Sequence, residues 1–200
     1  MEPFEKEIRA RGFHWIAGLD EAGRGPLAGP VVAAAVILPP GVRLLGVDDS
    51  KKLSPKKREA GFALLQEKAS AIGVGFVEAS EIDILNIHRA TLKAMEKAVA
   101  DLLCPPDFLL IDGVHTVSLP LPQQTIVKGD QKCLSIAAAS IVAKVTRDRI
   151  MIAYHREYPE YNFACHKGYG TKEHLQAIEK FGRCPLHRQS FRRIYQPSLL

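Results

Sequence analysis

Residues 16–30 read IAGLDEAGRGPLAGP, an apolar segment that runs directly into two acids and a glycine-rich bend. Two carboxylates beside buried apolar groups are unfavourable unless a cation neutralises them, because like charges at close range resist joint ionisation. Gly23, Gly25 and Gly29 allow a ligand to approach the main chain, and Arg24 adds hydrogen-bond donors. Two interpretations remain open here: a divalent-metal site beside a loop for an anionic sugar-phosphate, or a surface hairpin with solvated acids.

The composition is that of an ordinary globular protein. Its 200 residues suit one domain, or one domain with a small appendage, and the net charge of +5 favours an acidic partner, with nucleic acid the leading candidate. The N-terminus is charged, and no run reaches the roughly 18 apolar residues that a membrane span needs. We therefore expect a cytoplasmic protein with no membrane partner, and nothing in the sequence indicates more than a monomer.

The four cysteines contain no C-x-x-C pair, which favours reduced thiols over a disulfide framework or a zinc ribbon. Cys165 and His166 could be combined with Cys184 and His187 in a zinc site, but their spacing is unlike the usual zinc frameworks. We therefore expect no zinc at these residues.

The hydrophobic pattern predicts an α/β protein. Apolar or alternating runs indicate strands over residues 15–20, 31–38, 73–79, 108–112 and 123–127, the first two forming a hairpin-like pair. Periodicity and capping signals indicate helices over residues 55–70, from 80, over 87–103, from about 133 and over 172–181, with a short helix or arm over 2–12. Leu103 is expected on a buried stripe of its helix, and Ile152 on a stripe that packs against the sheet.

Acids follow three of these strands: Asp20 and Glu21, Asp112, and Asp130. Ligands of open α/β sheets bind outside the carboxyl ends of strands, so we expect these side chains to converge. Carboxylates without nearby His or Cys suit Mg²⁺ or Mn²⁺, and two such ions can assist phosphodiester cleavage. Successive strand residues point to opposite faces, however. We therefore expect the strand to end at Asp20 so that Glu21 swings round, or one of the two acids to contribute a backbone carbonyl.

Several motifs together resemble the bacterial ribonuclease HII family. They are GLDEAGRGPLAGPVV at 18–32, DSKKL at 49–53, IDG at 111–113, KGD at 128–130, SIAAASIVAKVTRD at 135–148 and HKGYGT at 166–171. The resemblance implies a ribonuclease H-like fold, a central mixed sheet flanked by helices. It implies a catalytic domain over residues 1–157, with a small C-terminal helical extension over 158–200 packing on it. It also implies cleavage of the RNA strand of RNA–DNA hybrids, and cleavage 5′ to single ribonucleotides in duplex DNA.

Position by position, the resemblance makes Asp20, Glu21, Asp112 and Asp130 the catalytic, metal-binding acids. It assigns Gly23, Arg24 and Gly25 to reading the ribonucleotide, and Tyr169 to stacking on the neighbouring sugar. A main chain free of side chains can reach a 2′-hydroxyl, the group that distinguishes RNA from DNA.

Basic residues elsewhere could follow the substrate backbone. Ser50, Lys51 and Lys52 are candidates for a phosphate contact, and the wider backbone track would include Lys144, Arg147, Lys167, Arg188, Arg192 and Arg193. Asp148 could either approach the acids or form a pair on the helix surface. His115, His155 and His166 are not needed as a general base if a metal activates water. The alternative function is a hybrid-binding protein without turnover, which the four acids disfavour because negative charge would repel a phosphate.

Overall fold

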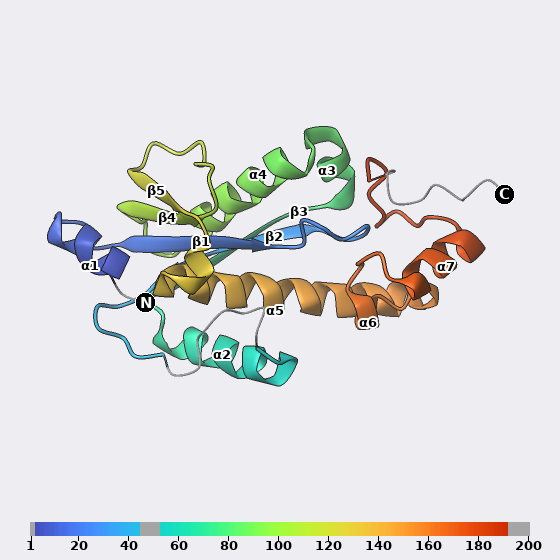
Figure 1. The fold of residues 1–200 in the computed structure, drawn as a ribbon, viewed down its shortest axis with the longest axis horizontal. Coiled ribbons are helices and arrows are strands. Elements are labelled where there is room, and N and C mark those ends of the chain that lie inside the picture. The colour runs from blue at the N-terminus through green and yellow to red at the C-terminus, as the bar shows by residue number, and fades with distance from the viewer. Residues whose placement is uncertain (1–2, 45–52, 192–200) are drawn as a thin grey trace.

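The computed structural model describes residues 3–44 and 53–191. Its centre is a five-stranded sheet with the strand order β3-β2-β1-β4-β5 (Figure 1). β1 pairs antiparallel with β2, and β2 with β3, whereas β1, β4 and β5 run parallel. The strands are β1 (Ile16–Ala22), β2 (Val31–Ile37), β3 (Ala71–Val77), β4 (Phe108–Asp112) and β5 (Gln123–Ile126). The predicted mixed sheet flanked by helices is confirmed.

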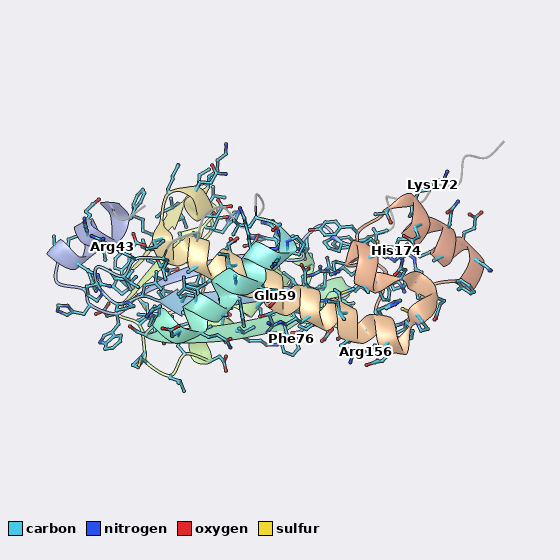
Figure 2. The ribbon with its side chains drawn as sticks, turned by 90° about the horizontal axis from the view of Figure 1, so that it is seen from below. Arg43, Glu59, Phe76, Arg156, Lys172 and His174 are labelled. Carbon is cyan, nitrogen blue, oxygen red and sulfur yellow. The ribbon has the colours of Figure 1, made fainter. Side chains whose placement is uncertain are left out.

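Helices cover both faces of this sheet. α3 (Ala79–Leu85) and α4 (Ile87–Ala100) lie on one face, and α5 (Leu134–Glu157) lies on the other, with α2 (Pro55–Lys68) packed outside it (Figure 1). The 3₁₀ turn η1 (Gly129–Gln131) leads into α5. The turn η2 (Pro159–Tyr161), α6 (Phe163–His166) and α7 (Lys172–Phe181) gather at the far end of α5, as the view from below also shows (Figure 2).

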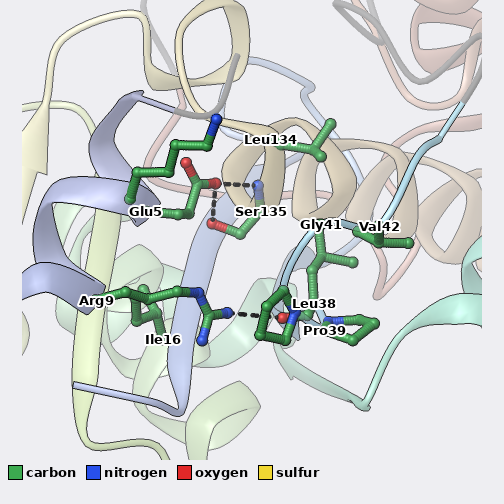
Figure 3. Close-up of a pocket in the computed structure, with 11 residues that line it drawn as sticks. Glu5, Arg9, Ile16, Leu38, Pro39, Gly41, Val42, Leu134 and Ser135 are labelled. Atoms are coloured by element: carbon green, nitrogen blue, oxygen red, sulfur yellow. Dashed lines mark hydrogen bonds between the residues drawn. The ribbon is translucent and has the colours of Figure 1, made fainter. Parts of the chain in front are cut away.

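The N-terminal helix α1 (Pro3–Ala10) is hydrogen-bonded to the first turn of α5. Glu5 Oε1 accepts hydrogen bonds from the backbone N–H and the hydroxyl of Ser135, at 2.9 and 3.1 Å (Figure 3). A carboxylate at a helix N-terminus stabilises the helix because it satisfies unpaired N–H groups and complements the helix dipole. A cavity of about 310 Å³ separates α1 from residues 38–42, and none of the predicted site residues lines it.

Several element boundaries differ from the predictions. β1 continues to Ala22, so the expectation that the strand ends at Asp20 is wrong. α4 ends at Ala100 because the chain turns towards Pro105 and Pro106, which leaves Leu103 92% exposed rather than on a buried stripe. Ile152 is also exposed, since it lies on the part of α5 that faces the C-terminal helices and not the sheet.

Gly18 allows α5 to lie directly against β1. A Cβ atom at this position would collide with the backbone of Ser135 and Ile136 and come within 2.6 Å of Ser135 Cβ. The close approach determines where every later residue of α5 lies along β1.

We expect Gly18→Ala to lower the free energy of unfolding by about 1–3 kcal/mol, because the added methyl group would push α5 away from β1. Gly61→Ala is the matched control: its Cβ would be 3.4 Å from Ile141 Cδ1, an ordinary contact, within a helix that prefers Ala. Urea unfolding should therefore move in opposite directions for the two variants. A Gly18→Ala protein that unfolds at the wild-type urea concentration would contradict the close packing.

Candidate active site

Three chain segments bring acids to the same edge of the sheet. Leu19 of β1 pairs with Ile111 of β4 in the parallel ladder, so Asp20 and Asp112 are the next residues on neighbouring strands. The backbone N–H of Gly129 donates to Asp112 Oδ1 at 2.7 Å, which places η1 beside the end of β4. Asp130 of η1 is itself buried. These four acids, Asp20, Glu21, Asp112 and Asp130, are called the acidic cluster below.

Burial and neighbouring charges perturb the Asp20 carboxyl. Its side chain is only 4% exposed. Burial raises the pKa of its carboxyl well above the usual range, and the charges of Glu21 and Asp112 raise it further. Hydrogen bonds from the Ser140 side chain and from the Glu21 N–H, at 2.7 Å, oppose that rise. The site therefore holds more negative charge than its surroundings stabilise, a condition that a cation would relieve.

Glu21 reaches Asp112 from the other face of the sheet. Both line a cavity of about 150 Å³ together with His88 and His115, whose rings are 4.3 Å apart. Arg24 Nη1 donates to Glu21 Oε1 at 3.3 Å, so a guanidinium faces this carboxylate. Within residues 3–44 and 53–191, no three His, Cys, Asp or Glu side chains are already arranged to hold a metal ion.

The glycine loop, residues 23–30, lies next to Tyr169. A Cβ atom at Gly25 would be 3.7 Å from Tyr169 Cε1, and the ring is 46% exposed. The N–H of Leu27 donates to the carbonyl of Gly168 at 2.8 Å, which joins the loop to the segment that carries Tyr169. The structure thus brings the predicted ribonucleotide reader and the predicted stacking aromatic together.

Lys144 and Asp148 form an ion pair of 2.6 Å on the surface of α5. This is the helix-surface pair, one of the two alternatives predicted for Asp148. Burial lowers the pKa of Lys144, although Asp148 opposes the shift. Both residues line a cavity of about 370 Å³ that also includes Lys167 and Tyr169. The candidates Ser50, Lys51, Lys52, Arg192 and Arg193 lie outside the described residues.

Arg147 and Arg188 do not follow a substrate backbone. Each is only 1% exposed, so the prediction that they contact phosphates on the surface is wrong. Their guanidinium groups donate to backbone carbonyls, chiefly of the glycine loop. The sequence offered no signal for this, because arginine side chains are usually solvated.

Three buried histidines support the segment that carries Tyr169. His174 Nδ1 donates to the Tyr169 carbonyl at 2.9 Å, so its Nε2 must accept the 3.1 Å hydrogen bond from His187 Nε2. His187 Nδ1 in turn accepts from the Cys184 N–H at 3.0 Å. The ring of His166 stacks on His174 at 4.4 Å, and its Nδ1 accepts from the Gly168 N–H. These partners require all three rings to be neutral.

The cysteines are free thiols, and Cys165 is exposed while Cys184 is buried beside His187. His174, which the sequence analysis did not single out, takes the position next to His166 and His187. Of the two histidines of the considered zinc site, His166 therefore hydrogen-bonds to the backbone, and His187 hydrogen-bonds to His174 and to the backbone.

Residues 17–194 match the protein family described as Ribonuclease HII. The chain belongs to the ribonuclease HII family. Ribonuclease HII from Geobacter metallireducens is 60% identical over 189 residues, which cover 94% of this chain and 89% of that protein. Ribonuclease HII from Syntrophus aciditrophicus is 59% identical over 192 residues, 96% of this chain and 91% of that protein.

A solved structure agrees with this assignment. The crystal structure of ribonuclease H2 from Pyrococcus horikoshii OT3 is similar with a TM-score of 0.76 and 27% identity, over 88% of this chain and 93% of that one. Membership of the ribonuclease HII family makes the chain a nuclease of the ribonuclease H type, an endonuclease that acts on RNA–DNA hybrids. Among the described residues, no helix is long and apolar enough to cross a bilayer.

The histidines predict a loss of stability as the pH falls from about 6.5 towards 4. Burial lowers the pKa of both His174 and His187 to about 4, whereas the unfolded chain keeps them near 6.5. In that interval the unfolded state binds protons that the folded state does not, so the free energy of unfolding falls. We expect urea unfolding to report a decrease of about 1–3 kcal/mol between pH 7 and pH 5.

His174→Asn should reduce this pH dependence, since one of the two buried rings is removed. His14→Asn, which changes an exposed histidine, should follow the wild-type curve. A wild-type protein whose stability changes with pH no more than that of His174→Asn would show that the buried rings are not the cause.

Proposed function

We propose that this chain hydrolyses the phosphodiester bond 5′ to a ribonucleotide, in RNA–DNA hybrids and in duplex DNA that contains a single ribonucleotide. The products would carry a 3′-hydroxyl and a 5′-phosphate. The observation that supports this proposal most directly is the burial of the Asp20 carboxyl beside Glu21 and Asp112, which raises its pKa. Excess negative charge at the end of a sheet, next to a loop suited to a ribose, is what a metal-assisted nuclease needs.

The acidic cluster has the donor chemistry for Mg²⁺ or Mn²⁺, since its ligands are carboxylate oxygens. Three of the four carboxylates face a donor of the protein: Asp20 the Glu21 N–H, Asp112 the Gly129 N–H and Glu21 the Arg24 guanidinium. We propose that Asp20, Glu21, Asp112 and Asp130 turn from such partners to hold the ion. A bound divalent cation supplies a water of lowered pKa and stabilises the leaving oxygen.

The remaining residues of the site would position the substrate. Gly23, Arg24 and Gly25 would contact the ribose, and the face of Tyr169 would stack on the neighbouring sugar. Lys144 would contact the nucleic acid from the cavity that it shares with Tyr169. Ser50, Lys51 and Lys52 would hold a phosphate.

A hybrid-binding protein without turnover is the alternative function. A purely binding surface gains nothing from a buried carboxyl held among like charges, because the same charges repel a phosphate. The acidic cluster therefore favours hydrolysis.

Asp112→Asn should lower cleavage of a duplex with one ribonucleotide by more than about 100-fold in Mg²⁺ or Mn²⁺, because it removes a ligand of the ion. Affinity for the same duplex should remain near that of the wild type, since the basic surface is intact. Glu67→Gln, an exposed acid of α2, is the control and should cleave normally.

Chelation of the metal should abolish wild-type cleavage in the same assay. Equal cutting with and without chelator, or no cutting in either, would remove the hydrolase proposal. Loss of binding to the same extent as activity in Asp112→Asn would contradict the role assigned to that side chain.

Tyr169→Ala should reduce the preference for a ribonucleotide junction over an all-RNA duplex more than it reduces affinity, because the ring face is lost. We expect a change of about 10-fold in the ratio of kcat/KM values. Tyr169→Phe keeps the ring and should retain the preference. An unchanged preference in Tyr169→Ala would exclude the stacking role.

A further inference from the structure

Arg147 and Arg188 are buried charges without an acidic partner. Both rank among the largest fully buried side chains of the protein. Among the described residues, no ion pair joins either guanidinium to a carboxylate. Burial lowers the pKa of Arg147 to about 10 and that of Arg188 to about 9, so both remain protonated at neutral pH. A buried charge is tolerated only when hydrogen bonds replace its water, and here backbone carbonyls do so.

Arg188 holds both ends of the glycine loop. Its Nη2 donates to the carbonyls of Gly23 at 2.6 Å and Gly29 at 2.8 Å, and its Nε donates to Gly29 at 3.0 Å. Its Nη1 donates to the carbonyl of Arg24 at 3.0 Å. The planar fork of arginine can satisfy several acceptors at fixed angles, which a lysine cannot.

Arg147 holds the second half of the glycine loop. Its Nε donates to the Pro30 carbonyl at 2.9 Å and its Nη2 to the Ala28 carbonyl at 3.1 Å. Its Nη1 donates to the Lys167 carbonyl at 3.0 Å, which ties the loop to the segment that carries Tyr169. A side chain at Gly23, where φ is +97°, would collide with Arg147, so the loop can lie this close only with glycine there.

These contacts determine where the N–H groups of the loop point. In a trans peptide the carbonyl of one residue and the N–H of the next point in opposite directions, and the described chain has no cis peptide. Because the Gly23 and Arg24 carbonyls face Arg188, the N–H groups of Arg24 and Gly25 point away from it. Within the described part of the chain, neither N–H donates to an acceptor of the protein.

We propose that Arg188, assisted by Arg147, is a positioning residue for ribonucleotide recognition: it turns two loop carbonyls inward and so presents the N–H groups of Arg24 and Gly25 to the 2′-hydroxyl oxygen. This inference rests on the proposed function and adds which group donates and which accepts the hydrogen bond between the loop and the ribose. The 2′-hydroxyl oxygen is the acceptor, because the Gly23 and Arg24 carbonyls face the buried Arg188 guanidinium and the N–H groups face away from it. The two positive charges behind the loop also favour the negatively charged backbone beside that sugar.

Hydrogen bonds of residues 186–190 hold Arg188 next to the glycine loop. The N–H of Arg188 donates to the Leu27 carbonyl at 2.9 Å, and the N–H of Gly29 donates to the Leu186 carbonyl at 2.9 Å. Asp83 of α3 accepts from the N–H groups of Gln189 and Ser190, both at 2.8 Å. The segment is therefore fixed on both sides of the guanidinium.

Arg188→Lys tests this role because it keeps the charge and removes the fork. Binding is measured in Ca²⁺ or chelator with two duplexes that differ only in one 2′-hydroxyl, one with a single ribonucleotide and one all-DNA. We expect the wild-type preference for the ribonucleotide to fall by about 10-fold, the cost of about one hydrogen bond to an exposed group. Affinity for the all-DNA duplex should stay within about two-fold. Arg149→Lys, an exposed arginine of α5 paired with Glu59, is the matched control and should keep the preference.

A second measurement needs no variant. In the wild-type protein, the backbone amide resonances of Arg24 and Gly25 should shift when the ribonucleotide duplex binds and remain in place with the all-DNA duplex. An unaltered preference in a folded Arg188→Lys protein would overturn the proposal, and so would amide resonances that respond equally to both duplexes. Failure of the proposed function would appear differently, as a wild-type protein that does not cut.

Discussion

The close contact between α5 and β1 determines the rest of the structure. Gly18 removes the side chain that would separate them, so the helix lies along the strand and past its end. Ser140 then reaches Asp20, and Arg147 reaches the glycine loop. Met151, one turn further, contacts the position where a side chain at Gly29 would lie. One helix thus sets the distance between the acidic cluster and the loop that is proposed to read the sugar.

The two charged parts of the site are stabilised in opposite ways. The acidic cluster holds negative charge that its own surroundings disfavour, which leaves room for a cation. The glycine loop has positive charge behind it, in guanidinium groups that donate hydrogen bonds to backbone carbonyls of the protein. Positive charge behind the loop favours a nucleic acid there, whereas the carboxylates repel a phosphate unless a cation neutralises them.

The sequence predicted the sheet, the flanking helices and the arrival of three acidic segments at one edge, because apolar runs and strand-end acids follow local rules. It did not predict that β1 continues through Asp20 and Glu21, since the pairing with β2 to Ala22 is a property of the whole ladder. The burial of Arg147 and Arg188 was missed for a similar reason: all but one of the backbone carbonyls that their guanidinium groups contact lie more than 100 positions away, and such contacts carry no sequence signal. His174 was missed because the sequence does not distinguish a buried polar residue of an amphipathic helix from an exposed one.

The contact between Arg188 and Gly23 spans 165 positions of the chain. On a ribosome, a nascent chain acquires its acids and Tyr169 well before residue 188 has been synthesised. The loop that is proposed to distinguish ribose from deoxyribose can adopt its final shape only after residue 188 has been synthesised. Synthesis therefore separates the appearance of the acidic cluster from the completion of the loop, and a product that terminates before residue 188 would contain the acids without the guanidinium that contacts the loop.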